Sequence, residues 1–198
     1  MINYRYAMPT DIESVSGLLL EVSYVTNFLY GNTYKKSEII EKISTAFISE
    51  EGKSSYKNFY VAEAVVGDTK KVIGFVAFYD SIHHKIDEKM KKLFSKKSLA
   101  VIEPLFHTIL SNSFYIFALI VDESFRNLNI GQQLINHVID QASKQDRTSV
   151  CLHVWDDNQK GIKFYLKNQF ILYHNVILST DSTLLPTNKK IHLAGINI

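Results

Sequence analysis

The chain has 198 residues, of which 46% are hydrophobic and 21% charged, the composition of one folded domain with a core. The net charge of +2 argues against the broad positive surface of a nucleic-acid-binding protein. A single cysteine excludes an internal disulfide and any multi-cysteine metal site. The longest apolar run, Phe114 to Val121, is far shorter than the ~20 residues of a membrane-spanning helix. No targeting signal is recognisable, so we expect a cytoplasmic protein with neither nucleic-acid nor membrane partners.

The N-terminal part predicts one strand followed by two helices. A strand is expected over 2–7, ended by Pro9, and the spacing of Thr10 and Glu13 is that of a capping box. Apolar residues then recur at helical spacing, at Ile12, Val15, Leu18, Leu19 and Val22. A second amphipathic helix is expected from Ser37, with one face formed by Ile39, Ile40, Ile43 and Phe47.

A hairpin and a basic segment follow. Strands over 58–66 and 72–79, joined by a turn at 67–70, predict the hairpin. The stretch 81–97 reads as a helix rich in lysine, with an apolar stripe of Ile82, Ile86, Met90, Leu93 and Phe94. The simplest interpretation of its charges is a solvated helix face.

The second half alternates strands and helices. Strands are predicted over 114–121, 149–155, 170–178 and 190–196, and helices from Ile130 and over 158–168. The first of these strands is apolar on both faces, as expected of a central strand buried on both sides. The strands on either side of the Ile130 helix should be parallel, with a right-handed crossover. A polar loop holding Pro186 joins the last two strands.

This order predicts an α/β fold: one domain over 1–198 with a central mixed sheet of about seven strands flanked by helices. Antiparallel pairing suits the strands outside the central β-α-β unit. A helical insertion over about 81–113 separates the third and fourth strands.

The loop over 122–129 runs from a buried strand into a helix, which is a natural anion site. Free backbone N–H groups and the positive end of the helix dipole meet there. Arg126 adds charge, Asn129 tolerates a positive φ, and Gly131 lets the backbone approach a ligand. An ordinary capped helix start is an equally good interpretation from chemistry alone. Neither the P-loop nor the dinucleotide fingerprint occurs.

Two segments carry a family resemblance. The segment 126–131, Arg-Asn-Leu-Asn-Ile-Gly, resembles the Arg/Gln-x-x-Gly-x-Gly/Ala motif of the GNAT superfamily of N-acetyltransferases. The segment 158–170 resembles that family's Asn-x-x-Ala-x-x-Phe-Tyr-x-x-x-Gly-Phe. Three positions depart from the family pattern: Asn129 and Gln169 stand where the family has Gly, and Gly161 where it has Ala.

The resemblance implies acetyl-CoA as cosubstrate and assigns roles to particular positions. It implies that the pyrophosphate binds to Arg126, Asn127, Leu128, Asn129, Ile130, Gly131 and Gln132. It implies that the pantetheine arm pairs with Leu119, Ile120 and Val121 and touches Asn158, an amide that can also cap a helix. A main-chain N–H of the same strand would donate to the oxyanion. The resemblance makes Tyr165 the general acid that protonates the leaving thiolate, and a phenol stays protonated at pH 7.

The general base stays open at this stage. Family members can carry a carboxylate where this chain has Phe117 and Ala118. Glu63, Asp80 and His153 are possible substitutes, as is water acting on an already neutral amine. The adjacent His83 and His84 do not predict a metal site, and Cys151 reads as an inert buried thiol.

The sequence therefore predicts an N-acetyltransferase that acts by direct transfer in a ternary complex, as a monomer or homodimer. The acceptor is a primary amine on a small molecule, a peptide or a protein. The basic stretch 85–97, if it borders the acceptor entrance, would repel polyamines and favour acidic or neutral acceptors. One alternative is a non-catalytic acyl-CoA-binding or regulatory module. Another is a different α/β protein that binds a nucleotide or phosphate ligand at the same helix start.

Overall fold

The computed structural model describes residues 1–21, 35–178 and 189–198. One sheet runs through these residues, with strand order β1-β2-β3-β4-β5-β7-β6. Its strands are β1 (Ile2–Tyr6), β2 (Phe59–Val66), β3 (Thr69–Asp80), β4 (Ser113–Val121), β5 (Ser149–Trp155), β6 (Ile171–Leu178) and β7 (Lys189–Asn197). The β4–β5 pair is parallel, and the other neighbouring pairs are antiparallel. The predicted seven-stranded mixed sheet is thus confirmed.

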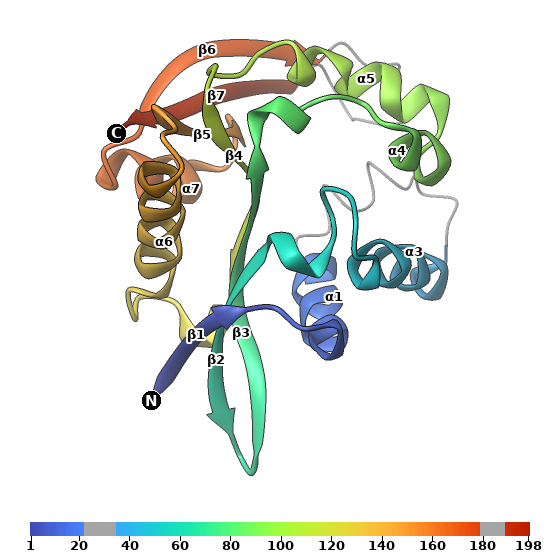
Figure 1. Ribbon diagram of the computed structural model, residues 1–198, viewed down its shortest axis with the longest axis vertical. Coiled ribbons are helices and arrows are strands. Elements are labelled where there is room, and N and C mark those ends of the chain that lie inside the picture. Colours follow the sequence, from blue (N-terminus) through green and yellow to red (C-terminus); the bar gives the residue numbers. More distant parts are fainter. Residues whose placement is uncertain (22–34, 179–188) are drawn as a thin grey trace.

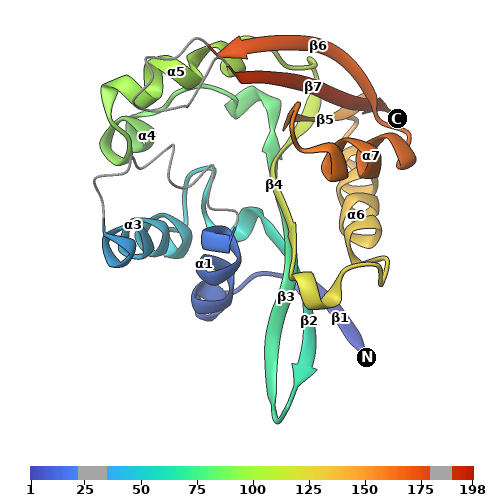
Figure 2. The same cartoon turned by 180° about the vertical axis from the view of Figure 1, so that it is seen from behind.

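Helices cover both faces of the sheet (Figures 1 and 2). The described helices are α1 (Ile12–Glu21), α3 (Lys36–Ile48), α4 (Glu88–Leu93), α5 (Lys96–Phe106), α6 (Ile130–Lys144) and α7 (Gln159–Lys167). One face carries α6 and α7, and the other carries α1 and α3 with α4 and α5 above them in Figure 1. Among the described residues, no helix is long and apolar enough to cross a membrane.

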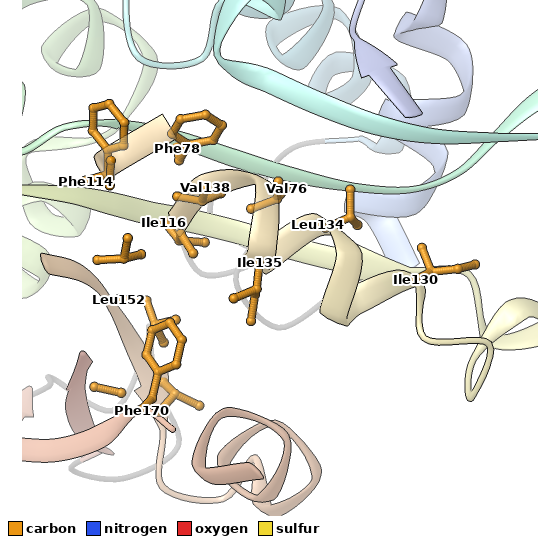
Figure 3. Packing of buried hydrophobic residues seen from close by; sticks show 14 of the residues in the cluster. Val76, Phe78, Phe114, Ile116, Ile130, Leu134, Ile135, Val138, Leu152 and Phe170 are labelled. Atoms are coloured by element: carbon orange, nitrogen blue, oxygen red, sulfur yellow. The ribbon is translucent and has the colours of Figure 1, made fainter. Parts of the chain in front are cut away.

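The main core lies between α6 and the sheet (Figure 3). The buried residues of α6 fall on one side of the helix, as amphipathic spacing requires: Ile130, Leu134, Ile135, Val138 and Ala142. These residues pack on Val76, Phe78, Phe114, Ile116 and Leu152 of the sheet. A second core on the opposite face joins Val15 and Phe47 of the helices to Phe59 and Phe75 of the strands. The two cores hold β3 and β4 rigidly between them.

The basic segment is not the single helix that the sequence predicts. It forms a short 3-10 turn (Ser81–His83) and then α4 and α5. Two side-chain caps cause the breaks: Asp87 Oδ1 accepts from Met90 N at 2.8 Å, and Ser95 Oγ accepts from Ser98 N at 3.0 Å. The predicted apolar stripe is wrong at Ile82, which is 74% exposed. The α5 helix instead packs against the face of β6 and β7 through Ile102.

The predicted cap at Thr10 is also wrong. The chain first forms a 3-10 turn, Pro9–Asp11, where the carboxylate of Asp11 accepts from Met8 N at 2.7 Å. The same carboxylate binds Arg5 at 2.7 Å, and Arg5 also binds Glu63 at 2.7 Å. Burial opposes the ionisation of Asp11, but the hydrogen bonds from Arg5 and Met8 N outweigh it and lower its pKa. Asp11 thus takes the part predicted for Glu13, the acidic side chain that accepts from the N-cap amide, and the N-cap residue is Met8.

Two predicted features lie outside the described residues: Val22 at the end of the first helix, and the loop that holds Pro186. The hairpin turn between β2 and β3 is tighter than the predicted 67–70, because Val66 pairs directly with Thr69. Gly67 takes the left-handed conformation that such a turn requires, with φ of 62°.

The helix α7 ends in a Schellman motif, in which Phe170 N donates to Tyr165 O and Gln169 N to Leu166 O, both at 3.1 Å. This motif needs a left-handed residue, and Gln169 supplies it with φ of 67°. The other left-handed non-glycine residues described are Asn or Asp: Asn112, Asn127, Asn129 and Asp146. These tolerate the conformation, whereas a glutamine is strained there.

Replacing Gln169 with Gly is therefore expected to raise the free energy of unfolding by about 0.5–1 kcal/mol, since relief of strain exceeds the added unfolded-state entropy. Urea unfolding measures the change. The matched control is Asn129→Gly, which removes a tolerated left-handed residue and should give no gain. A destabilised Gln169→Gly variant would contradict the strain argument.

Candidate active site

The strands β4 and β5 separate halfway along β4. They pair in parallel from Ser113–Ser149 to Ile116–Leu152. Beyond this point β4 keeps β3 as its neighbour, and β5 keeps β7. The stretch 117–121 of β4 thus has an open backbone edge, and its side chains are half-buried. This corrects the prediction that β4 is buried on both sides along its whole length.

A bulge lies at the point of parting. Ala77 pairs with Ala118 while Phe78 pairs with Ile116, so Phe117 has no partner on β3. The bulge reverses the alternation of side chains between the two halves of β4. The adjacent residues Phe117 and Ala118 therefore both pack on the face that carries α1. Tyr115 lies on this face as well, and both Tyr115 and Phe117 lie next to Tyr79.

The open edge leads into an uncapped helix start. After β4 the chain makes a 3-10 turn, Glu123–Phe125, and Asn127 and Asn129 are left-handed with φ of 64° and 59°. Asn129 occupies the N-cap position of α6, and its side chain makes no capping hydrogen bond. The first amides of α6 are therefore left for a ligand, with the positive end of a 15-residue helix behind them.

Two residues of this loop make contacts that the sequence did not indicate. The guanidinium of Arg126 binds Glu123 Oε1 at 3.0 Å and Val121 O at 3.3 Å, so part of its charge is neutralised. A Cβ on Gly131 would lie 3.0 Å from Cζ of Phe164. Gly131 therefore lets α7 pack against the start of α6, besides leaving the backbone open.

The remaining loop positions have distinct environments. Leu128 is 56% exposed, whereas the side chain of Ile130 is in the core. The side chain of Gln132 donates to Asn136 Oδ1 at 2.9 Å along the helix. Leu119, Ile120 and Val121 lie together on the open edge. The loop and the edge thus form one continuous strip of backbone.

The second motif forms α7, beside α6 (Figure 2). Asn158 caps α7, because its Oδ1 accepts from Gly161 N at 2.9 Å. A Cβ on Gly161 would lie 2.5 Å from Asn158 Nδ2, so the glycine gives this cap its room. The Tyr165 ring meets Phe164 edge to face and lies tilted to Phe170, with ring centroids at 5.4 Å and 5.6 Å. Burial raises its pKa, and no described residue forms a hydrogen bond with its hydroxyl.

Two tyrosine–histidine pairs lie on the opposite face, where β4 and β5 part. Tyr115 Oη and His153 Nδ1 are 3.0 Å apart. His153 directly follows Leu152, the last β5 residue that pairs with β4. Burial, reinforced by the neighbouring His84, lowers the pKa of His153 to about 4. Its Nε2 is buried, with the backbone of Thr108 nearby, and makes no hydrogen bond with a described residue.

The second pair comes from β3 and the segment after it. Tyr79 Oη and His84 Nδ1 are 2.9 Å apart, and His84 Nε2 lies 3.1 Å from Leu105 O. A carbonyl oxygen only accepts, so Nε2 carries the proton and the Tyr79 hydroxyl donates to Nδ1. The His84 ring lies 4.2 Å from the Tyr115 ring and 6.4 Å from the His153 ring. Sequence reasoning missed Tyr79, His84 and Tyr115, since no spacing shows that they meet.

The two candidate carboxylates are engaged elsewhere. Glu63 binds Arg5, and Asp80 binds Arg147 at 2.6 Å and caps the turn that follows β3. Among the three candidate bases, His153 alone lies at the parting of β4 and β5. Cys151 is fully buried next to Ser113, and burial raises its pKa, as an inert thiol requires.

Comparison with known proteins agrees with this geometry. The model of the acetyltransferase (GNAT) family matches residues 32–170. An N-acetyltransferase from Staphylococcus aureus Mu50 is 16% identical, with a TM-score of 0.74 over 98% of this chain and 100% of that one. NAA60 from Arabidopsis thaliana, solved with acetyl-CoA, is 20% identical, with a TM-score of 0.61 over the whole of both chains. PaiA N-acetyltransferase from Thermoplasma acidophilum, solved with coenzyme A, is 16% identical, with a TM-score of 0.55 over 100% of this chain and 99% of that one.

At these identities the solved structures show a shared fold. No curated protein sequence gives a significant match.

Proposed function

Because the chain belongs to the GNAT family of acetyltransferases, whose cosubstrate is acetyl-CoA, we propose that it transfers an acetyl group to a primary amine. Transfer is direct, within a ternary complex of protein, acetyl-CoA and amine. We further propose that 1–198 forms one domain in which about 81–113 is an insertion. The observation that carries the function is the open edge of β4 running into the uncapped start of α6.

The residues present fit acetyl-CoA. The amides of a pantetheine arm can pair with the open edge at Leu119, Ile120 and Val121 as an added strand would. The backbone over 126–132 can donate to the pyrophosphate from the helix start. Asn158 Nδ2 forms no hydrogen bond with a described residue and can reach the arm while Oδ1 caps α7.

Tyr165 is the proposed general acid. Its part-buried phenol stays protonated across the physiological range, because burial raises its pKa. Its hydroxyl has no described hydrogen-bond partner, so a proton is available to a leaving thiolate.

His153 is the proposed general base, with Tyr115 as its hydrogen-bond partner. Its lowered pKa keeps the imidazole neutral at pH 7, able to accept a proton from the amine directly or through a water molecule. The absence of a hydrogen bond from Nε2 to any described residue supports this role, since such an atom can take a water molecule or the amine as partner. In this role Nδ1 carries the ring proton and donates it to Tyr115 Oη.

The acceptor class follows from the neighbours and from charge. NAA60 was also solved with a bisubstrate analogue, and several neighbours are described as N-acetyltransferases. In this chain α4 and α5 are rich in exposed lysine, and Lys89 fastens α4 to the segment after α3 through Glu51 O at 2.7 Å. We propose that these lysines favour acidic or neutral acceptors over polyamines.

The deciding experiment titrates the purified protein with acetyl-CoA by calorimetry, with adenosine diphosphate as control, and then follows thiol release with a panel of amines. Acetyl-CoA should bind at micromolar concentration and the control weakly. Thiol release should need an amine, and an acidic peptide with a free α-amine should exceed spermidine in kcat/KM.

Each other result points to a different protein. Binding without thiol release for any amine would favour the non-catalytic acyl-CoA-binding module. Equal binding of the nucleotide control would favour a general phosphate ligand. Spermidine as the best acceptor would contradict only the proposed preference for acidic or neutral acceptors, and acetyl transfer to an amine would stand.

A further inference from the structure

We propose that His84, in the segment between β3 and α4, is a positioning residue for the reaction. Together with Tyr79 it holds the Tyr115–His153 pair in place. This inference rests on the proposed function of His153, because a positioned group needs a reaction to serve. Nothing in the family resemblance assigns a role to the segment 81–112.

The first argument is the locked state of His84 itself. Both ring nitrogens are engaged, Nδ1 with the Tyr79 hydroxyl and Nε2 with Leu105 O. Leu105 belongs to α5, so the imidazole ties β3 to this helix. The side chain is 8% exposed. A buried imidazole with two partners holds one rotamer and one tautomer.

The second argument is what the locked ring touches. Its centroid is 4.2 Å from the Tyr115 ring and 4.8 Å from the Phe106 ring. The Tyr79 ring lies 5.5 Å from the Tyr115 ring on the same face. Tyr115 thus packs against two rings that are themselves fixed, and its hydroxyl is held toward His153 Nδ1.

The third argument is the attachment of the segment that carries His84. Lys53, from the stretch between α3 and β2, donates to Lys85 O and pairs with Asp87 Oδ2 at 3.3 Å. Its Nζ lies 5.7 Å from the centre of the Tyr79 ring and 5.3 Å from that of Phe106. The loop after His84 is therefore clamped to the body of the protein, which is what precise placement of a catalytic pair requires.

Charge adds a further coupling between the two histidines. The titratable and charged groups facing the cluster are Lys53, Tyr79, Asp87, Tyr115, Cys151, His153 and Tyr165. Burial lowers the pKa of His84 to about 4, so the ring is neutral at pH 7. His84 in turn helps to lower the pKa of His153. Without His84, the pKa of His153 should rise.

The test compares four variants of the full chain. His84→Gln removes the ring but keeps an amide that can donate to Leu105 O, and Tyr79→Phe removes only the hydroxyl. His153→Gln measures how much kcat falls when the proposed base is removed, and His83→Ala, at the exposed neighbouring residue, is the matched control. The measurements are kcat and KM for both substrates, the pH profile of kcat, and the imidazole tautomers and pKa values by nitrogen-15 NMR.

We expect His84→Gln to lower kcat by about 10- to 100-fold, the scale of a misplaced catalytic group, with KM for acetyl-CoA unchanged. The acidic limb of its kcat profile should move to higher pH, and NMR should show the matching rise for His153. Tyr79→Phe should shift the acidic limb and the pKa of His153 in the same direction by less, and His83→Ala should change neither quantity.

Unchanged kcat and unchanged acidic limb in folded His84→Gln and Tyr79→Phe would overturn the inference. If His153→Gln is fully active, the proposed base is wrong and the positioning role falls with it. If the wild type transfers no acetyl group, the NMR arm still decides whether His84 fixes His153: an altered tautomer or pKa in His84→Gln supports that coupling, and an unaltered one overturns it.

Discussion

Replacing Tyr165 with Phe is expected to lower kcat by about 10²-fold or more, the usual size of a general-acid contribution. The ring keeps its contacts with Phe164 and Phe170, so the packing of α7 is preserved. The substitution removes one hydroxyl, which has no described hydrogen-bond partner whose loss could disturb the fold. Steady-state thiol release gives kcat, and calorimetry should show an unchanged Kd for acetyl-CoA.

The matched control for this experiment is Tyr173→Phe. Tyr173 is also part-buried and its hydroxyl donates to Asn197 Oδ1 at 3.4 Å, on the strands β6 and β7. This variant should keep full activity. A Tyr165→Phe variant as active as the wild type would remove the general-acid assignment and leave protonation of the thiolate to water.

The elements of the fold were predictable because their signals are local. The helix α6 begins at Ile130 as predicted, since its apolar positions repeat strictly along the sequence. The strand β5 has the predicted bounds, and β4 and β5 are parallel because the helix between them requires it. Periodicity and connection rules act on adjacent residues, so a single sequence reveals them.

The breaks in the basic segment were less predictable. Both Asp87 and Ser95 can lie within a helix or cap one, and the choice depends on where α5 packs. Tertiary packing on β6 overrides the helical pattern of 81–97. In the same way the helix start shifts from Thr10 to Met8 and Asp11, because Asp11 is held by Arg5, which also binds Glu63 on a strand that the local pattern does not bring close.

The candidate site was predictable in its loop but not in its base. The backbone conformation of Asn129 follows from the residue type and the motif, and the structure has it left-handed. The parting of β4 from β5 has no sequence signal, because it is a property of two strands and their outer neighbours. His84 and His153 lie 69 positions apart in the chain, and only the folded sheet brings their rings to 6.4 Å.

Acid is expected to destabilise this protein well before its carboxylates titrate, because two buried histidines must stay neutral. The folded-state pKa of both His84 and His153 is about 4, against roughly 6.5 in an unfolded chain. A lowered folded-state pKa means that the unfolded state binds protons first as the pH falls. The stabilisation is therefore complete above about pH 6.5 and is lost as the pH falls toward 4.

Between pH 7.5 and 5.0 each histidine should cost about 2 kcal/mol of unfolding free energy, and the pair about 4 kcal/mol. Urea unfolding at the two pH values measures this difference. The pairs of Arg5 with Asp11 and Glu63 contribute little in this window, because both carboxyls have lowered pKa values. His153→Gln should remove about half of the pH dependence, and His84→Gln more than half, because loss of His84 also raises the pKa of His153. The exposed His83→Ala should keep all of it. An unfolding free energy that is flat from pH 7.5 to 5.0 would mean that both rings are open to water in solution, and neither could then be the neutral, buried group on which the base and its positioning depend.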